Sequence, residues 1–228
     1  MKKIVFLLIL ALLGGYALLL AKPELYFDKS ADYGIFTLRA RGELPASPEA
    51  VLNSAGDRIS GSDIYTPGQR FELILTSGPW EYRLFTPFLK GDFFRVNPYN
   101  AAVFLAPGAD FAGDKAVTAS GYLRSLSGVV TAAAAWVMTL RKVLPLTYLT
   151  MGDWELRGYA ELLSGGTGEF NPSDACAGGD RPGLEDYKDG LMLDRLLKEE
   201  NLVYNDLLLR GASEEDAERR FRRNYCGG

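Results

Sequence analysis

The chain opens with an uncharged hydrophobic run from Ile4 to Ala21, directly after Lys2 and Lys3. Its 18 residues are at the lower limit of the length that crosses a bilayer core. A helix in the core of a soluble protein would instead carry a polar face, which this run lacks. Because basic residues stay on the cytoplasmic side, the lysines orient the N-terminus inward. The alternative is a secretory signal that is cleaved after Ala21. Such a cut would put Leu19 at the third position before the cleavage site, where a small residue is expected. We predict an uncleaved signal-anchor over residues 1–21, with the rest of the chain outside the cytoplasm.

The next segments predict a tether and then the first elements of a folded domain. Residues 22–33 are mixed and polar, which suits a short tether, so a single domain is expected from residue 34 to 228. Alternating apolar and polar positions at 34–40 and again at 70–76 are typical of strands. Between them, Ser-Pro-Glu at 47–49 is the order of a helix N-terminus, with the serine side chain as its cap.

The pattern changes from mixed to helical along the chain. A helix is expected after Ser77, followed by two aromatic-rich strands with a turn at Asn97 between them. Beyond residue 113 only helices are predicted. The strands are expected at 93–96 and 101–105, the later helices at about 122–143, 154–163 (capped by Asp153), 184–200, 202–209 and after the capping residue Ser213, and a loop at 170–183. The fold class is therefore α+β, a small mixed sheet with helices followed by a helical half.

Charge and composition narrow the possible partners. The first 21 residues hold 2 of the 25 lysines and arginines, so 23 basic and 29 acidic side chains remain, a net charge of −6. Nucleic acid is an unfavourable partner for such a surface. With 47% apolar residues in the whole chain, the part outside the anchor can bury one sizeable core.

The two cysteines, Cys176 and Cys226, lie on the side of the membrane where disulfides persist. A bond between them would close a loop of about 50 residues and hold the last helix. Two free thiols are the alternative.

Histidine is absent from the chain. Its absence excludes Ser-His-Asp and Cys-His arrangements, a histidine general base and zinc sites built on imidazole. The glycine-rich residues 165–168 lack the lysine and the preceding strand of a phosphate loop, so we interpret them as a helix stop.

Residues 126–163 carry two motifs on successive predicted helices. Leu-Ser at 126–127 begins the first helix, and Trp-Glu-Leu-Arg-Gly-Tyr-Ala-Glu at 154–161 forms most of the second. In this the chain resembles the core of a gluzincin-like zinc metallopeptidase family of small, often membrane-anchored bacterial proteins. There one helix carries H-E-x-x-H, often after Leu-Ser, and the second carries a pattern like W-x-x-E-G-x-A-E. Two packed helices without this history are the alternative for the same residues.

The resemblance implies which positions would have formed a metal site. It places the two zinc-ligating histidines at Ala132 and Trp136, the general-base glutamate at Ala133 and the third ligand at Arg157. All four have lost the family's side chain, and only Glu161, in a supporting position, keeps its chemical type. The resemblance therefore implies a site without metal or other cofactor and without catalytic residues.

Helix geometry adds expectations about these replacements. Positions 132 and 136 are one turn apart and point into one space, which a tryptophan can fill. Trp136 is therefore expected to be buried against the second motif helix, near Tyr159 or Arg157. Arg157 and Glu161 are also one turn apart, and are expected to form either an exposed ion pair or a buried one.

These observations favour a non-catalytic, peptidase-like domain on the periplasmic or extracellular side of a bacterial cytoplasmic membrane. Its partners would be the lipid bilayer, through residues 4–21, and an envelope protein or peptide held in the cleft or at the sheet edge. One alternative is an envelope hydrolase that uses Asp153, Glu155 and Glu161. Another is a purely structural envelope component.

Overall fold

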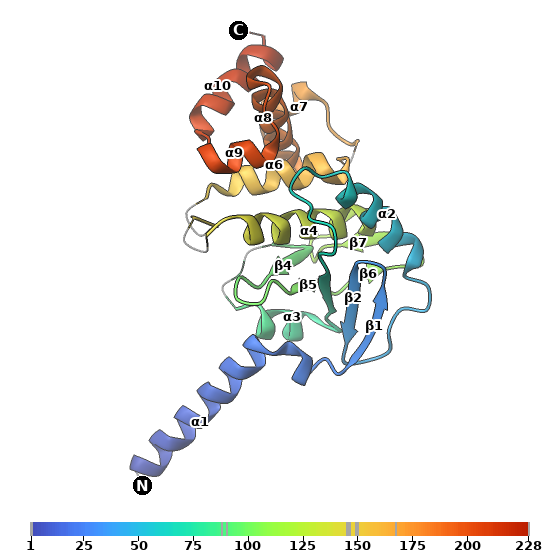
Figure 1. The fold of residues 1–228 in the computed structure, drawn as a ribbon, viewed down its shortest axis with the longest axis vertical. Helices are drawn as coiled ribbons and strands as arrows, with labels where there is room; N and C mark the ends of the chain where they lie inside the picture. Colours follow the sequence, from blue (N-terminus) through green and yellow to red (C-terminus); the bar gives the residue numbers. More distant parts are fainter. Residues whose placement is uncertain are drawn as a thin grey trace.

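The computed structural model describes residues 2–87, 89, 91–144, 147–148, 151–166 and 168–227. Their arrangement is α+β, with a mixed sheet in the middle, an apolar N-terminal helix projecting from one end and helices gathered at the other (Figure 1). The described residues form one sheet of five strands in the order β1-β2-β3-β5-β4 and one of three in the order β6-β7-β8. The strands are β1 Lys29–Tyr33, β2 Phe36–Ala40, β3 Phe71–Leu75, β4 Phe94–Val96, β5 Val103–Leu105, β6 Ala109–Asp110, β7 Lys115–Val117 and β8 Leu123–Arg124.

The large sheet is parallel in its centre and antiparallel at both edges. β2 and β3 pair in parallel because helix α2, Glu49–Ser60, carries the chain back between them, and β3 pairs in parallel with β5. β1 and β4 each pair antiparallel with one neighbour. Ser47 does not cap α2, whose boundary residue is Pro48.

The helix α4, Leu126–Lys142, crosses the middle of the domain and is buried along almost its whole length. It packs between the sheet and helix α6, Asp153–Ser164 (Figure 1). Gly158 of α6 lies against helix α8, Leu184–Glu200, so closely that a Cβ atom would sit 2.7 Å from the backbone oxygen of Asp189. The absence of a side chain at Gly158 therefore sets the spacing between α6 and α8.

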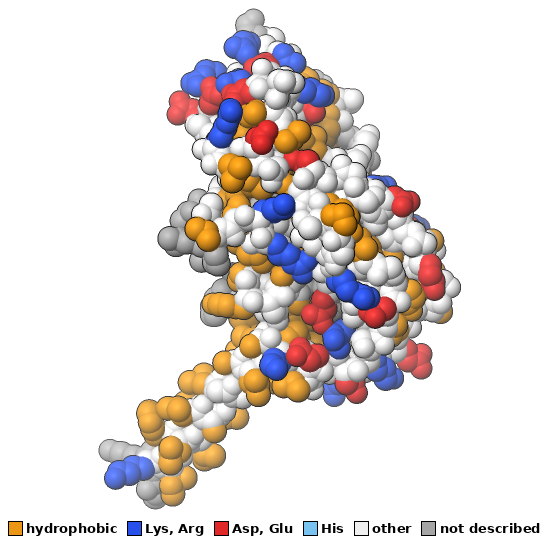
Figure 2. Space-filling view, in the orientation of Figure 1, with side chains coloured by type: hydrophobic (Ala, Val, Ile, Leu, Met, Phe, Trp, Pro, Cys, Tyr) orange, Lys and Arg blue, Asp and Glu red, His pale blue; other side chains and the backbone are white. Residues whose placement is uncertain are grey.

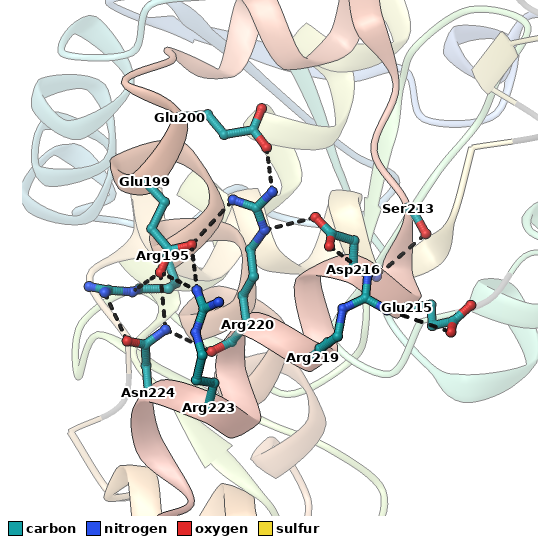
Figure 3. A network of polar contacts seen from close by, with 10 residues as sticks. All are labelled: Arg195, Glu199, Glu200, Ser213, Glu215, Asp216, Arg219, Arg220, Arg223 and Asn224. Atoms are coloured by element: carbon teal, nitrogen blue, oxygen red, sulfur yellow. Dashed lines mark hydrogen bonds and ion pairs between the residues drawn. The ribbon is translucent and has the colours of Figure 1, made fainter. Parts of the chain in front are cut away.

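The other C-terminal helices are α7 Pro172–Ala177, α9 Tyr204–Arg210 and α10 Glu214–Tyr225. Charged side chains hold α10 to α8, and one disulfide joins α10 to α7. Glu199 of α8 accepts hydrogen bonds from Arg195, Arg223 and Asn224 (Figure 3). The predicted disulfide is confirmed, because Cys176 and Cys226 are bonded with their Cα atoms 5.4 Å apart, which ties α7 to the end of α10.

The N-terminal apolar helix α1, Lys2–Ala21, is the one described helix long and apolar enough to cross a membrane, and it is of the signal or anchor kind. It ends at the turn η1, Pro23–Leu25, next to helix α3, Pro79–Phe85. Leu19 and Leu20 pack against a small aromatic cluster that includes Phe27, Phe85 and Phe104. Folded structure therefore begins before Gly34. The prediction of a tether over 22–33 is wrong in this respect, since these residues contain η1 and the edge strand β1.

Several other boundaries differ from the sequence prediction. The helix expected from Tyr122 begins only at Leu126, because Ser125 caps it and the preceding residues form β8. Asp153 is the first residue of α6 and not its cap, which is Gly152. The expected loop at 170–183 contains α7, with a capping box at Asn171. Gly165 ends α6 as expected, whereas Thr167, in the same glycine-rich segment, lies outside the described residues.

Candidate functional site

A cavity of about 640 Å³ lies between the edge strand β4 and the helices α4 and α6. Four of the five positions singled out from the sequence line it together: Ala132 and Trp136 from α4, Arg157 and Glu161 from α6. Ala133 instead packs in the hydrophobic core. The helices that carry the two motifs are thus adjacent, and the side chains at 132, 136, 157 and 161 share one space.

Trp136 contributes an aromatic wall to this cavity. Its ring packs edge-to-face against Phe94 of β4, with ring centroids 5.6 Å apart. The expected burial of Trp136 against Tyr159 or Arg157 is wrong: Trp136 is half-buried, Tyr159 stacks on Tyr204 with centroids 3.7 Å apart, and Arg157 pairs with carboxylates. Trp136 therefore joins α4 to the sheet edge, not to α6.

Glu161 forms an ion pair with Arg124, the last residue of β8. Nη2 of Arg124 lies 2.6 Å from Oε2 of Glu161, and the two side chains are 9% and 5% exposed. The expected pair between Arg157 and Glu161 is therefore replaced by a buried pair with an arginine from another element. The other carboxylate oxygen, Oε1, is buried and has no hydrogen-bond partner among the described residues.

Arg157 is surrounded by carboxylates of α8. Its Nε lies 2.7 Å from Oδ2 of Asp189, and its Nη2 lies 2.8 Å from Oε1 of Glu185. Asp186 stands between the two arginines, 3.4 Å from Arg124 and 3.7 Å from Arg157. The result is a continuous charged network that forms one side of the cavity.

The carboxylic acids in this network have perturbed proton affinities. Burial raises the pKa of Asp189 to about 7, although Arg157 counteracts the shift. Burial also raises the pKa of Asp186, with Arg124 opposing it. Burial lowers the pKa of Arg157, but Asp189, Glu185 and Asp186 more than offset this, so the pKa of Arg157 is raised. Arg157 therefore stays charged and holds Asp189 in place.

The three carboxylates of the hydrolase alternative do not meet in one place. Asp153 and Glu161 line the cavity, but Glu155 does not. Glu155 is buried, and its Oε1 accepts a hydrogen bond from the backbone N–H of Ala212 at 3.3 Å. Across the described residues, no three acidic or cysteine side chains are grouped closely enough to hold a metal ion.

The sheet edge borders the same cavity. Phe93 accepts a backbone hydrogen bond from Ala106, and Asn97 donates one to Ala102, so residues 93, 95 and 97 direct their backbone groups toward β5. The backbone groups of Phe94 and Val96 therefore face away from the sheet, where Gly91 packs closely against the carbonyl oxygen of Phe94. No described strand pairs with this side of β4.

Arg124, Asp186 and Asp189 were missed by sequence reasoning. Arg124 fell inside a predicted helix, so its position on the cavity wall could not be recognised. Asp189 was hidden among the charged residues of the predicted helix 184–200, and its approach to Gly158 is a tertiary contact that no local sequence signal reveals.

No family model matches this chain, and no curated protein sequence is similar to it. The resemblance to zinc metallopeptidases therefore stays a hypothesis that rests on the sequence motifs at 126–127 and 154–161.

Proposed function

We propose that this chain is a non-catalytic binding protein anchored in a bacterial cytoplasmic membrane, whose cavity holds an extended segment of an envelope protein or a peptide. The observation that carries the proposal is the convergence of positions 132, 136, 157 and 161 on one cavity beside an unpaired sheet edge. An extended segment can add backbone hydrogen bonds to such an edge and place side chains in the adjacent pocket.

The lining of the cavity suits a peptide. Trp136 and Phe94 supply aromatic surface, which is the usual source of binding energy at protein and peptide interfaces. Ala132, in the place of a metal ligand in the resembling family, leaves room above α4. The arginines and carboxylates on the opposite wall supply polar groups that can fix the orientation of a ligand.

The chemistry of the same residues argues against peptide hydrolysis. Glu161 is the buried carboxylate at the cavity, and the Arg124 guanidinium holds one of its oxygens. Because this ion pair is almost completely buried and occupies Oε2, the carboxylate is poorly placed to act on a bound peptide. The four positions inherited from the family pattern hold alanine, alanine, tryptophan and arginine, none of which is an ordinary zinc ligand.

The topology of the proposal rests on α1 and the disulfide. An apolar helix preceded by lysines favours an outward-facing domain, and a disulfide persists in a compartment outside the cytoplasm. We assign α1 as an uncleaved single-pass anchor.

The test uses the full-length protein in a mild detergent and a displayed library of unstructured peptides. Selected peptides should bind the protein and lose at least about tenfold in affinity to the Ala132→Phe variant, which fills the cavity. Ala50→Phe, on an exposed position of α2, is the matched control and should bind normally. Equal binding to both variants would contradict the proposal, and cleavage of the peptides that is abolished by Glu161→Gln would favour the hydrolase alternative.

A further inference from the structure

The end of α1 is built into the folded domain. Asn97 donates from Nδ2 to the backbone oxygen of Leu20 at 3.0 Å, and Asn100 donates to that of Ala21 at 3.2 Å. These are carbonyl groups of the last helical turn, which have no partner within the helix. The two asparagines, from the turn between β4 and β5, therefore cap α1 and fix its direction relative to the sheet.

A second contact lies deeper along α1. The hydroxyl group of Tyr16 donates a hydrogen bond of 2.6 Å to the backbone oxygen of Leu84, near the end of α3. Tyr16 precedes Ala21 by five residues, which is about 7–8 Å along a helix. The end of α3 therefore lies beside α1, at a point about 7–8 Å before α1 ends.

The length of α1 then decides how close the domain lies to the membrane. The uncharged run from Ile4 to Ala21 extends about 26 Å, less than a hydrocarbon core of about 30 Å. From Ile4 to Tyr16 the distance is only about 18 Å. With Lys2 and Lys3 at the inner surface, the helix has no spare length with which to lift the domain off the outer surface, and any tilt shortens its reach further.

Exposed apolar and aromatic side chains lie near this junction, and Figure 2 shows hydrophobic side chains where the apolar helix meets the domain, with charged ones beside them. Trp80 and Leu84 lie one turn apart on α3 and are 58% and 39% exposed. Tyr99, in the turn that caps α1, is 92% exposed, and Leu25 of η1 is 58% exposed. Tryptophan and tyrosine side chains favour the boundary between headgroups and hydrocarbon, where an apolar ring and a polar atom are both accommodated.

The charges on this face are compatible with that boundary. Glu81, the acidic residue of α3, is fully buried and accepts hydrogen bonds from the backbone and side chain of Ser77. Arg83 is exposed on the same helix, and Lys22 and Glu24 are exposed where α1 ends. Basic side chains at such a position can reach lipid phosphates.

We propose that α3 and the β4–β5 turn lie in the outer headgroup layer of the bilayer that α1 crosses, so that the domain docks on the membrane surface through Trp80, Leu84 and Tyr99. The inference rests on the anchoring of α1 that belongs to the proposed function. We take the bilayer to be the occupant of this apolar face, because the face is continuous with the apolar helix α1. The hydrogen bonds of Tyr16, Asn97 and Asn100 fix the two to each other. Docking would hold the cavity in one orientation relative to the membrane.

The test measures quenching of tryptophan fluorescence by brominated lipids in the full-length protein reconstituted into phosphatidylcholine vesicles. The contribution of Trp80 is the fluorescence lost in Trp80→Phe, and Trp136→Phe gives the matched contribution of a tryptophan in the cavity. We expect lipids brominated near the headgroup end of the acyl chain to quench most of the Trp80 contribution and little of the Trp136 contribution. The triple variant Tyr16→Phe, Asn97→Ala, Asn100→Ala, in which the domain is uncoupled from α1, should show weaker quenching of Trp80.

Extraction of the vesicles at alkaline pH separates failure of this inference from failure of the anchor. Protein that stays with the vesicles while Trp80 is quenched no more than Trp136 would overturn the docking and leave the anchor intact. Protein that leaves the vesicles would overturn both. Disulfide crosslinking between copies of a Trp80→Cys variant, without quenching of wild-type Trp80, would assign this face to a second copy of the chain and overturn the docking as well.

Discussion

Nη2 of Arg124 lies 2.6 Å from Oε2 of Glu161, and both side chains are almost completely buried at the wall of the cavity. This pair connects β8 to α6 at the cavity that Ala132, Trp136 and Arg157 also line. A permanent positive charge from the protein thus meets the carboxylate in this place.

Removal of Arg124 should therefore be strongly destabilising. Arg124→Leu leaves Glu161 buried without its counter-charge, and we expect a loss of about 3–5 kcal/mol in the free energy of unfolding. The matched control is Arg219→Leu, which breaks an exposed ion pair and should cost less than about 1 kcal/mol. Urea unfolding of the full-length protein in detergent measures both. The double variant Arg124→Leu, Glu161→Leu should recover most of the loss, and equal losses for the single and double variants would contradict this assignment.

Reversal of the charge at Arg157 should also be harmful, because Arg157 pairs with carboxylates of α8. Arg157→Glu would set a fourth carboxylate against Glu185, Asp186 and Asp189, and not against Glu161. We expect it to cost about 3–5 kcal/mol, and Arg157→Gln clearly less, because the glutamine keeps a donor without adding negative charge. Thermal unfolding monitored by circular dichroism distinguishes the two. Similar midpoints for the Gln and Glu variants would show that the carboxylates do not act on position 157.

The raised pKa of Asp189 predicts how stability depends on pH. Its pKa of about 7 in the folded protein lies above the value of about 3.9 for an unfolded chain. The folded state therefore binds the proton more tightly, so the contribution of this group to stability is greatest at low pH and falls as the pH rises from about 4 to about 7. Asp189→Asn should flatten this dependence. Urea unfolding between pH 5 and pH 8 measures it, and identical pH profiles for the variant and the wild type would contradict the prediction.

The disulfide should contribute substantially to the stability of the C-terminal helices. Replacement of both Cys176 and Cys226 by serine reopens a loop of about 50 residues, and the chain-entropy model gives a loss of about 4 kcal/mol. The same loss should follow reduction of the wild-type protein before unfolding. Free thiols at both positions in protein isolated without reductant would contradict the bond.

Local sequence signals were sufficient for some elements and insufficient for others. The helix Leu184–Glu200 and the disulfide were predicted correctly, because the run of helix-compatible residues between Gly183 and Asn201 and the even cysteine count are properties of the sequence itself. The strand β1 was missed because it is an exposed edge strand whose Lys-Ser-Ala-Asp-Tyr sequence shows no apolar alternation. Its pairing with β2 is a tertiary interaction that no local pattern encodes.

The candidate site was likewise predictable from the sequence only in part. The two motif helices were predicted, and their cavity-lining positions follow from helix geometry. The partners of these positions were not predicted. Phe94 reaches Trp136 from the sheet, and Arg124 reaches Glu161 from β8, so both contacts depend on how distant segments come together.

The most direct test of the central claim is photocrosslinking of a selected peptide from position 136. A benzoylphenylalanine introduced in place of Trp136 lies in the cavity, and the same residue in place of Ala50 lies on the exposed surface of α2. We predict that the peptide crosslinks to position 136 and not to position 50, and that mass spectrometry recovers it uncleaved. Equal crosslinking at both positions, or cleavage of the peptide at a defined bond, would contradict a non-catalytic binding cavity between α4 and α6.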